Sequence, residues 1–163
     1  MLLKLLRIAT LILAPLAGLV PATAQDAAEK PILLVDGRTT AGKSEFTRSE
    51  LEALGTATIR TSTPWHDGAQ TFEGVPLARL MAHVGASGTK VQVVALNRYK
   101  TEIPVADFAA QGAILALKRN GQYMEVRDKG PLFVIYPFDA KPDLKSELYY
   151  GRSAWQVRSI TVE

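Results

Sequence analysis

Residues 56–84, TATIRTSTPWHDGAQTFEGVPLARLMAHV, carry the signals that decide the fold. The segment Thr56–Thr63 is rich in Thr and Ile with alternating character, which predicts a strand. Gly74–Val84 has apolar residues at helical spacing, with Pro76 near its first turn and Gly85 after its end. A strand, a polar loop and an amphipathic helix in one stretch indicate mixed α and β structure.

Further strands and short helices are predicted around this stretch. Apolar or alternating runs that predict strands are Ile32–Val35, Val91–Leu96, Thr101–Val105, Ala113–Lys118, Leu132–Tyr136 and Trp155–Val162. Thr47–Glu50 has the spacing of a capping box and predicts a short helix, and Asp107–Gln111 fits one helical turn. Asn120-Gly121 is a turn signal between two of the strands. We therefore expect an α+β fold, a single domain with a mixed sheet and a few short helices.

The composition excludes several kinds of functional site. The 163 residues include no Cys and only two His, His66 and His83. Disulfides, iron–sulfur clusters, thiolate nucleophiles and cysteine-held metals are therefore excluded. Two histidines are too few for a site of several imidazoles, so we expect no protein-ligated metal.

Residues 1–24 have the three parts of a secretory signal peptide. The cations Lys4 and Arg7 precede the apolar run Ile8–Val20, and Ala22-Thr23-Ala24 is a small-x-small cleavage site. The apolar run is shorter than the roughly 20 residues that a membrane-spanning helix needs. The alternative is an uncleaved membrane anchor.

Cleavage at this site would leave residues 25–163 as the mature domain. Loss of the two cations reduces the formal net charge from +3 to +1, which gives no electrostatic reason to expect nucleic acid as a partner. We therefore expect a single exported, periplasmic domain.

The segment Thr61–Gly68 is the richest in functional groups, and Pro64 predicts that it is irregular and can line a cleft. Trp65 offers a flat apolar face for stacking on a heteroaromatic ring. Asp67 can accept paired hydrogen bonds from the amino and ring N–H groups of a guanine-like or pterin-like edge. The alternative is that Trp65 packs on the core and Asp67 caps a turn.

Catalytic motifs are weak by comparison. His66 beside Asp67 suggests a dyad, but adjacent residues of an extended segment point to opposite faces, and no third partner is visible. The sequence has no G-x-S-x-G, H-E-x-x-H or glycine-rich phosphate loop. The residues therefore favour a binding domain.

Three more polar-aromatic segments are predicted as loops at strand ends, where ligand clefts are often built. They are Asn97–Lys100, Asp128–Pro131 and Tyr149–Trp155. In the second of these, Lys129 is a donor for anionic or carbonyl oxygens.

Five segments in order resemble the sulfite oxidase molybdopterin-binding fold, over about Ile32 to Val162. They are Trp65 and Gly68 with Phe72–Leu77, Ala95–Tyr99 with Ile103-Pro104, Asn120–Met124, Lys129–Leu132 and Arg152–Trp155. The closest resemblance is to short exported members of this fold. These are small molybdopterin-dependent oxidoreductases or periplasmic pterin-binding regulators of the PruR type.

In full oxidases of the fold, a cysteine after the strand before the W…G loop ligates molybdenum. The corresponding region here, Thr58–Thr63, has no Cys. A Ser or Thr oxygen is a poor replacement for a thiolate. The resemblance therefore implies a pterin or molybdopterin-like ligand without a metal held by the protein.

The resemblance also implies which residues bind the ligand. Residues that stand where the fold lines its pterin cleft are Trp65, Tyr99, Lys129, Arg152 and Trp155, and the residues themselves add Asp67 and Asn97. Trp65 is expected to flank the ring and Asp67 to read its amino-pyrimidine edge. Lys129 and Arg152 are expected to meet oxygens or a side-chain phosphate. For Trp155 the alternative is a core position.

Three hypotheses about function follow. The first is a non-enzymatic periplasmic protein that senses a reduced pterin. It would regulate an inner-membrane signalling protein with cyclic-di-GMP synthesis or hydrolysis domains, as in the regulators it resembles. The second is a small molybdopterin-dependent oxidoreductase. The third is a scaffold that kept the fold and lost the cleft.

Overall fold

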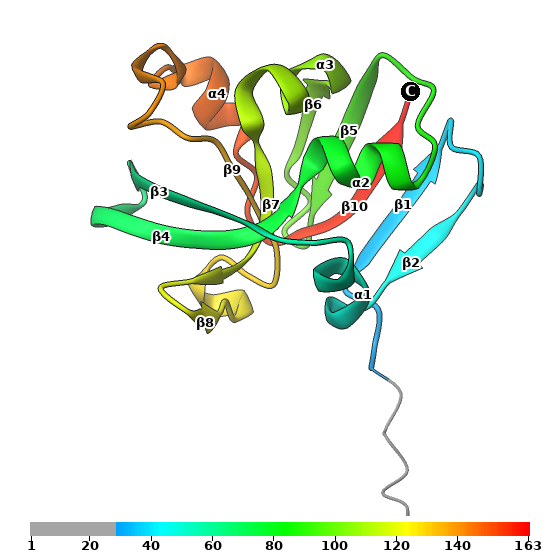
Figure 1. Ribbon diagram of the computed structural model, residues 1–163, viewed down its shortest axis with the longest axis horizontal. Helices are drawn as coiled ribbons and strands as arrows, with labels where there is room; N and C mark the ends of the chain where they lie inside the picture. Colours follow the sequence, from blue (N-terminus) through cyan, green and yellow to red (C-terminus); the bar gives the residue numbers. More distant parts are fainter. Residues whose placement is uncertain (1–28) are drawn as a thin grey trace, which may run out of the picture.

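The computed structural model describes residues 29–163 (Figure 1), so the predicted signal peptide lies outside the described residues. In chain order the elements are β1 (Leu33–Gly37), β2 (Ser44–Phe46), α1 (Arg48–Ala53), β3 (Ala57–Thr63), β4 (His66–Pro76), α2 (Leu77–His83), β5 (Lys90–Ala95), β6 (Lys100–Pro104), α3 (Val105–Asp107), β7 (Ile114–Arg119), β8 (Gln122–Tyr123), β9 (Phe133–Ile135), α4 (Glu147–Arg152) and β10 (Val157–Val162). A π-helical turn (Phe108–Gly112) follows α3, and 3-10 turns cover Val126–Asp128 and Pro142–Leu144. None of the helices in the described range has the length and hydropathy of a membrane span.

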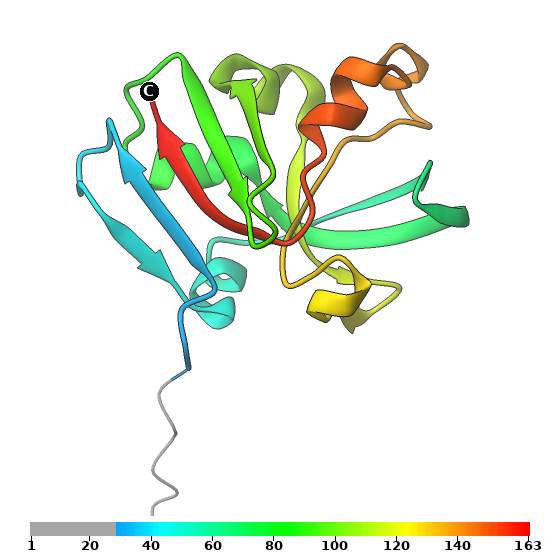
Figure 2. The same cartoon turned by 180° about the vertical axis from the view of Figure 1, so that it is seen from behind.

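The strands form two sheets. The first has the order β2-β1-β10-β5-β6 and is mixed, because β1 and β10 are parallel while the other neighbours are antiparallel. The second has the order β3-β4-β7-β8, with β9 also paired to β7. Figure 2 shows the first sheet from the side opposite α2, where no helix of the described residues crosses it. The predicted α+β class with a mixed sheet is confirmed, and the division into two sheets is new.

Strand β7 is buried on both faces. Leu115 and Leu117 belong to a core cluster with α2 and the first sheet, whereas Ile114 and Ala116 belong to a second cluster with aromatic residues of β4 and β9. This follows because successive side chains of a strand point to opposite faces. Burial on both sides explains why β7 is a continuous apolar run instead of an alternating one.

Helix α1 begins where the sequence predicts, whereas α2 begins at Leu77 instead of the predicted Gly74, because Gly74–Pro76 end strand β4. The Thr47 side chain accepts a hydrogen bond from the Glu50 backbone N–H, and the Glu50 carboxylate accepts one from the Thr47 N–H at 2.7 Å. Helix α2 starts directly after Pro76, at the end of β4. A Cβ at Gly74 would overlap the carbonyl oxygen of Leu115, so only glycine lets β4 approach β7 this closely.

Two predicted loops are in fact regular structure. Most of Thr61–Gly68 belongs to the β3–β4 hairpin, which turns at Pro64-Trp65. Pro64 has no backbone N–H, and in the turn this does not remove a hydrogen bond between the two strands. Residues Tyr149–Arg152, predicted as a loop, lie on α4. The turn at Asn120-Gly121 leads into β8, a short strand that the sequence did not predict.

Candidate functional site

A cavity of about 250 Å³ lies where the β3–β4 turn, the β5–β6 turn and α4 meet. Its lining residues are Trp65, Asn97, Tyr99, Glu147, Tyr150, Gly151, Ser153 and Trp155. We call it the aromatic cavity. Four of the seven predicted site residues line it, namely Trp65, Asn97, Tyr99 and Trp155.

Trp65 is both a cavity wall and a core residue. Its ring centroid lies 5.6 Å from that of Trp155 and 5.9 Å from that of Tyr150, in edge-to-face arrangements. Its ring also lies 5.4 Å from Phe133, and Trp65 packs against both core clusters. The alternative that Trp65 packs on the core is confirmed, while its stacking on a ligand stays a prediction, and the aromatic contacts keep its ring in place.

The β5–β6 turn is held against α4. The Asn97 side-chain oxygen accepts a hydrogen bond from the Tyr99 backbone N–H at 3.0 Å. The Tyr99 hydroxyl donates to the Gly151 carbonyl oxygen at 2.7 Å. The Tyr99 side chain is 45% exposed, so its ring remains available to a ligand although its hydroxyl is already used.

Lys129 and Arg152 lie differently relative to the cavity. The Lys129 ammonium is 5.1 Å from the centroid of the Trp155 ring. Trp155 lines the cavity, whereas Lys129 does not. The Arg152 guanidinium donates to the Asp107 carboxylate at 2.6 Å, and both side chains are 16% exposed. Although the neighbours of Arg152 in sequence line the cavity, Arg152 itself ties α4 to α3.

Asp67 lies in a separate polar hollow of about 440 Å³, which shares Trp65 with the aromatic cavity. The other residues that line this hollow are Pro64, His66, Gln70 and Arg119. The Asp67 backbone carbonyl accepts a hydrogen bond from the Gln70 amide at 2.7 Å. The structure therefore does not bring Asp67 together with Asn97, Tyr99 and Trp155.

His66 is held neutral in the same hollow. Its Nδ1 forms a hydrogen bond of 2.8 Å with the Thr63 hydroxyl, and its buried Nε2 has no partner among residues 29–163. Burial, followed by the positive charges of Arg119 and Lys129, lowers the pKa of His66 to about 4. No hydrogen bond joins His66 to Asp67 in the described part of the chain, which agrees with the case against a dyad.

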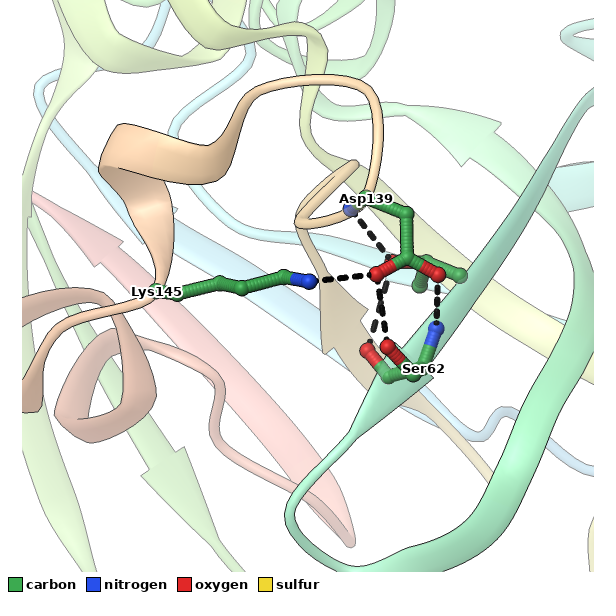
Figure 3. Close-up of polar contacts among 4 residues, drawn as sticks. Ser62, Asp139 and Lys145 are labelled. Carbon is green, nitrogen blue, oxygen red and sulfur yellow. Dashed lines mark hydrogen bonds and ion pairs between the residues drawn. The ribbon is translucent and has the colours of Figure 1, made fainter.

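The end of β3 is closed by four residues that we call the Asp139 clamp: Thr61, Ser62, Asp139 and Lys145 (Figure 3). The Ser62 N–H and hydroxyl donate to the two Asp139 carboxylate oxygens at 2.7 and 2.6 Å, and the Lys145 ammonium lies 2.8 Å from one of them. The buried Thr61 hydroxyl accepts from the Asp139 N–H at 3.0 Å. Hydrogen bonds from Lys145 and Ser62 hold the pKa of the Asp139 carboxyl well below its usual range.

Four lining residues of the aromatic cavity were not among the predicted site residues: Glu147, Tyr150, Gly151 and Ser153. The last three lie in Tyr149–Trp155, which was predicted as a loop that could line a cleft, whereas Glu147 was not singled out because α4 was not predicted. The available signal was Ser146, a typical N-cap residue, followed by a run of helix-compatible side chains. Glu147 and Tyr150 line the cavity from the beginning of α4.

Comparison with known families identifies the chain. The model of the oxidoreductase molybdopterin binding domain matches residues 33–139, and the chain belongs to this family. No curated protein matches the chain.

A solved structure shows the same fold. The sulfane dehydrogenase SoxCD from Paracoccus pantotrophus superposes with a TM-score of 0.60 at 18% sequence identity. The match covers 80% of this chain and 37% of the SoxCD chain, so this protein spans little more than a third of that length. The sulfite oxidase-type fold is confirmed, and the finer resemblance to PruR-type regulators stays a prediction.

The residues present do not fit a molybdenum held by the protein. The chain has no Cys, and among the described residues no group of three His, Asp or Glu side chains could hold a metal ion. The hydroxyls at the end of β3 belong to Thr61, Ser62 and Thr63. The first two are engaged with Asp139, and the third with His66. Hard hydroxyl oxygens are poor substitutes for a thiolate. The aromatic cavity, in contrast, has aromatic side chains at four of its eight lining residues.

Proposed function

We propose that this protein binds a pterin in the aromatic cavity and acts as a periplasmic sensor without redox chemistry of its own. The observation that carries the proposal is the Asp139 clamp. The clamp closes the region Thr58–Thr63, which the resemblance matches to the metal-ligating cysteine of oxidases of the fold, while the nearby cavity beside Trp65 remains open.

The size and walls of the cavity support a bicyclic ligand. Pockets for drug-sized ligands usually measure about 300–1,000 Å³. A cavity of about 250 Å³ lies just below this range. Four of its eight lining residues are aromatic, and ring faces bury a flat heterocycle at little cost in side-chain entropy. Lys129 places a positive charge over the ring of Trp155, a lining residue, and this charge would suit oxygens of the ligand ring or of its side chain.

The sensing role rests on the resemblance to the PruR-type regulators, together with the signal-peptide features of residues 1–24. In this proposal the protein is exported to the periplasm and regulates an inner-membrane partner with cyclic-di-GMP synthesis or hydrolysis domains. If pterin binding changes the affinity for the partner, the partner must change the affinity for pterin by the same factor. Capture of such a membrane protein should therefore differ with and without pterin.

The first test uses protein purified from a periplasm. The protein is denatured, and the released small molecules are analysed by fluorescence and mass spectrometry alongside a molybdenum measurement. We expect a pterin without molybdenum. If no pterin is released, pterins are added back: a ligand at 100 times its Kd stabilises the fold by about 2.7 kcal/mol and raises the Tm by several degrees. Absence of any shift across a pterin series would overturn the proposal.

A second candidate is a small molybdopterin-dependent oxidoreductase. The match to the oxidoreductase molybdopterin binding domain favours it. Stoichiometric molybdenum in the protein purified from a periplasm would establish this candidate over the sensor. It would also require metal coordination that needs no cysteine.

A further inference from the structure

We propose that Glu147 reads the donor edge of the ligand and so selects 2-amino-4-oxo pterins over related rings without the amino group. The inference rests on the proposed function, which it deepens by naming the recognising group. The sequence assigned this role to Asp67, whose place in the polar hollow separates it from the aromatic cavity.

Glu147 is the one carboxylate among the described residues that line the aromatic cavity. It is the first residue of α4, and it shares the cavity with Trp65, Tyr99 and Trp155. A ring lying between these aromatic walls would therefore have its edge within reach of a carboxylate.

The Glu147 carboxylate is also available to a ligand. Within residues 29–163 it takes part in no hydrogen bond or ion pair, whereas Asp107 and Asp139 are each paired with a cation. Two other polar side chains of the cavity are already donating, since the Tyr99 hydroxyl bonds the Gly151 carbonyl and the Ser153 hydroxyl bonds the Tyr149 carbonyl. The Asn97 oxygen is used by the Tyr99 N–H.

The chemistry of the pterin edge matches this carboxylate. A 2-amino-4-oxo pterin presents its 2-amino group and its N3–H side by side, as two parallel donors. A carboxylate accepts such a pair with both oxygens, and hydrogen bonds to a charged acceptor are about twice as strong as neutral ones. Lumazine has a carbonyl oxygen in place of the amino group. Its approach to the carboxylate would bring two acceptors together and leave one of them unpaired.

The experiment compares pterin and lumazine binding to the full mature protein by fluorescence titration and calorimetry. Wild-type protein should bind pterin at least about tenfold more tightly than lumazine. In Glu147→Gln the affinity for pterin should fall by about 10- to 100-fold while lumazine binding changes little, so that the selectivity collapses. Asp143→Asn removes an exposed carboxylate outside the cavity and should leave both affinities unchanged. Melting curves without ligand check that the variants remain folded.

Each other outcome has a distinct meaning. If wild type binds pterin and Glu147→Gln keeps the selectivity, the inference is overturned while the proposed function stands. Collapse of the selectivity in Asp67→Asn instead would return the role to Asp67 and overturn it equally. Guanine carries the same pair of donors, so guanosine is the third probe. If guanosine binds, Glu147→Gln should weaken its binding as it weakens that of pterin, and guanosine binding that is unchanged in the variant would overturn the inference. If wild type binds no pterin, the proposed function itself fails.

Discussion

The Asp139 clamp and the aromatic cavity both involve the segment Thr61–Trp65 of the β3–β4 hairpin. They differ in whether their carboxylate is paired within the protein. In the clamp, both oxygens of the Asp139 carboxylate accept hydrogen bonds from Ser62, and one of them also meets Lys145. In the cavity, the Glu147 carboxylate has no partner among the described residues.

This difference indicates which polar groups near the hairpin stabilise the fold and which are open to a ligand. A polar group paired inside the protein contributes to folding and is closed to a ligand. A polar group left open beside apolar walls is the usual arrangement of a ligand site. Each prediction below asks whether a substitution acts on stability, as expected near the clamp, or on binding, as expected in the cavity.

The largest effect is expected for Trp65→Ala, because Trp65 belongs to both the core and the cavity. Replacing a core Trp by Ala costs about 3–5 kcal/mol, and partial exposure of Trp65 puts the expected loss at about 2–4 kcal/mol. Pterin affinity should fall by more than about tenfold, as base–aromatic contacts of about 1–3 kcal/mol indicate. Urea unfolding and pterin titration measure the two effects.

Trp65→Phe serves as the milder variant, because it keeps an aromatic ring against Phe133. It should fold and still bind pterin more weakly than wild type. Pterin binding unchanged in both Trp65 variants would remove the aromatic cavity from the ligand site. The pterin would then have to bind elsewhere on the protein.

Arg152→Gln should act on stability. Removing one partner of a buried ion pair costs about 3–5 kcal/mol, and for this partly buried pair we expect about 2–3 kcal/mol. Asp107→Asn should cost a similar amount, since it breaks the same pair. If Arg152 meets ligand oxygens, as the sequence predicted, Arg152→Gln will weaken pterin binding and Asp107→Asn will not.

Asp139→Asn should destabilise the protein by about 1–2 kcal/mol at pH 7 without changing pterin affinity, since the carboxylate is partly exposed. The pKa of Asp139 in the folded state is lower than the roughly 3.9 of an unfolded chain. Its stabilisation is therefore fully present above about pH 4 and is lost as the pH falls through the folded pKa. The gap in unfolding free energy between wild type and variant should narrow from pH 7 to pH 3. A gap that stays constant would show that the carboxylate charge does not stabilise the clamp.

Local patterns predicted most of the elements, because each pattern depends on a few neighbouring residues, but they did not predict the strands β2, β4 and β8. The capping box at Thr47 and Glu50 begins α1, and the apolar runs became β1, β5, β7 and β9. The site was predicted in part, because aromatic residues at strand ends mark a cleft without showing which polar group turns into it. Asp67 and Glu147 could be told apart only once the hairpin and α4 were placed, since the two carboxylates are far apart in sequence and lie in different hollows.

Arg152 shows the same limit for a cation. In the sequence, a basic residue between small and aromatic neighbours can pair equally well with an anionic ligand or with an acidic side chain of the protein. Its partner Asp107 lies on α3, and no local pattern predicts a pair between these two elements.

The smallest effect on stability is expected for Lys129→Gln. The Lys129 ammonium lies over the Trp155 ring at 5.1 Å, and an exposed cation–π contact contributes about 0.5–1 kcal/mol. Its effect on binding depends on the ligand: affinity for neutral pterin should change little, whereas affinity for a pterin with a phosphorylated side chain should fall several-fold. This loss should shrink at high salt, because exposed charges are screened. Titration of both ligands at two salt concentrations measures it. Equal losses for the two ligands would mean that Lys129 acts by holding the Trp155 ring in place, so that Lys129, like the residues of the clamp, serves the structure and not the recognition of the ligand.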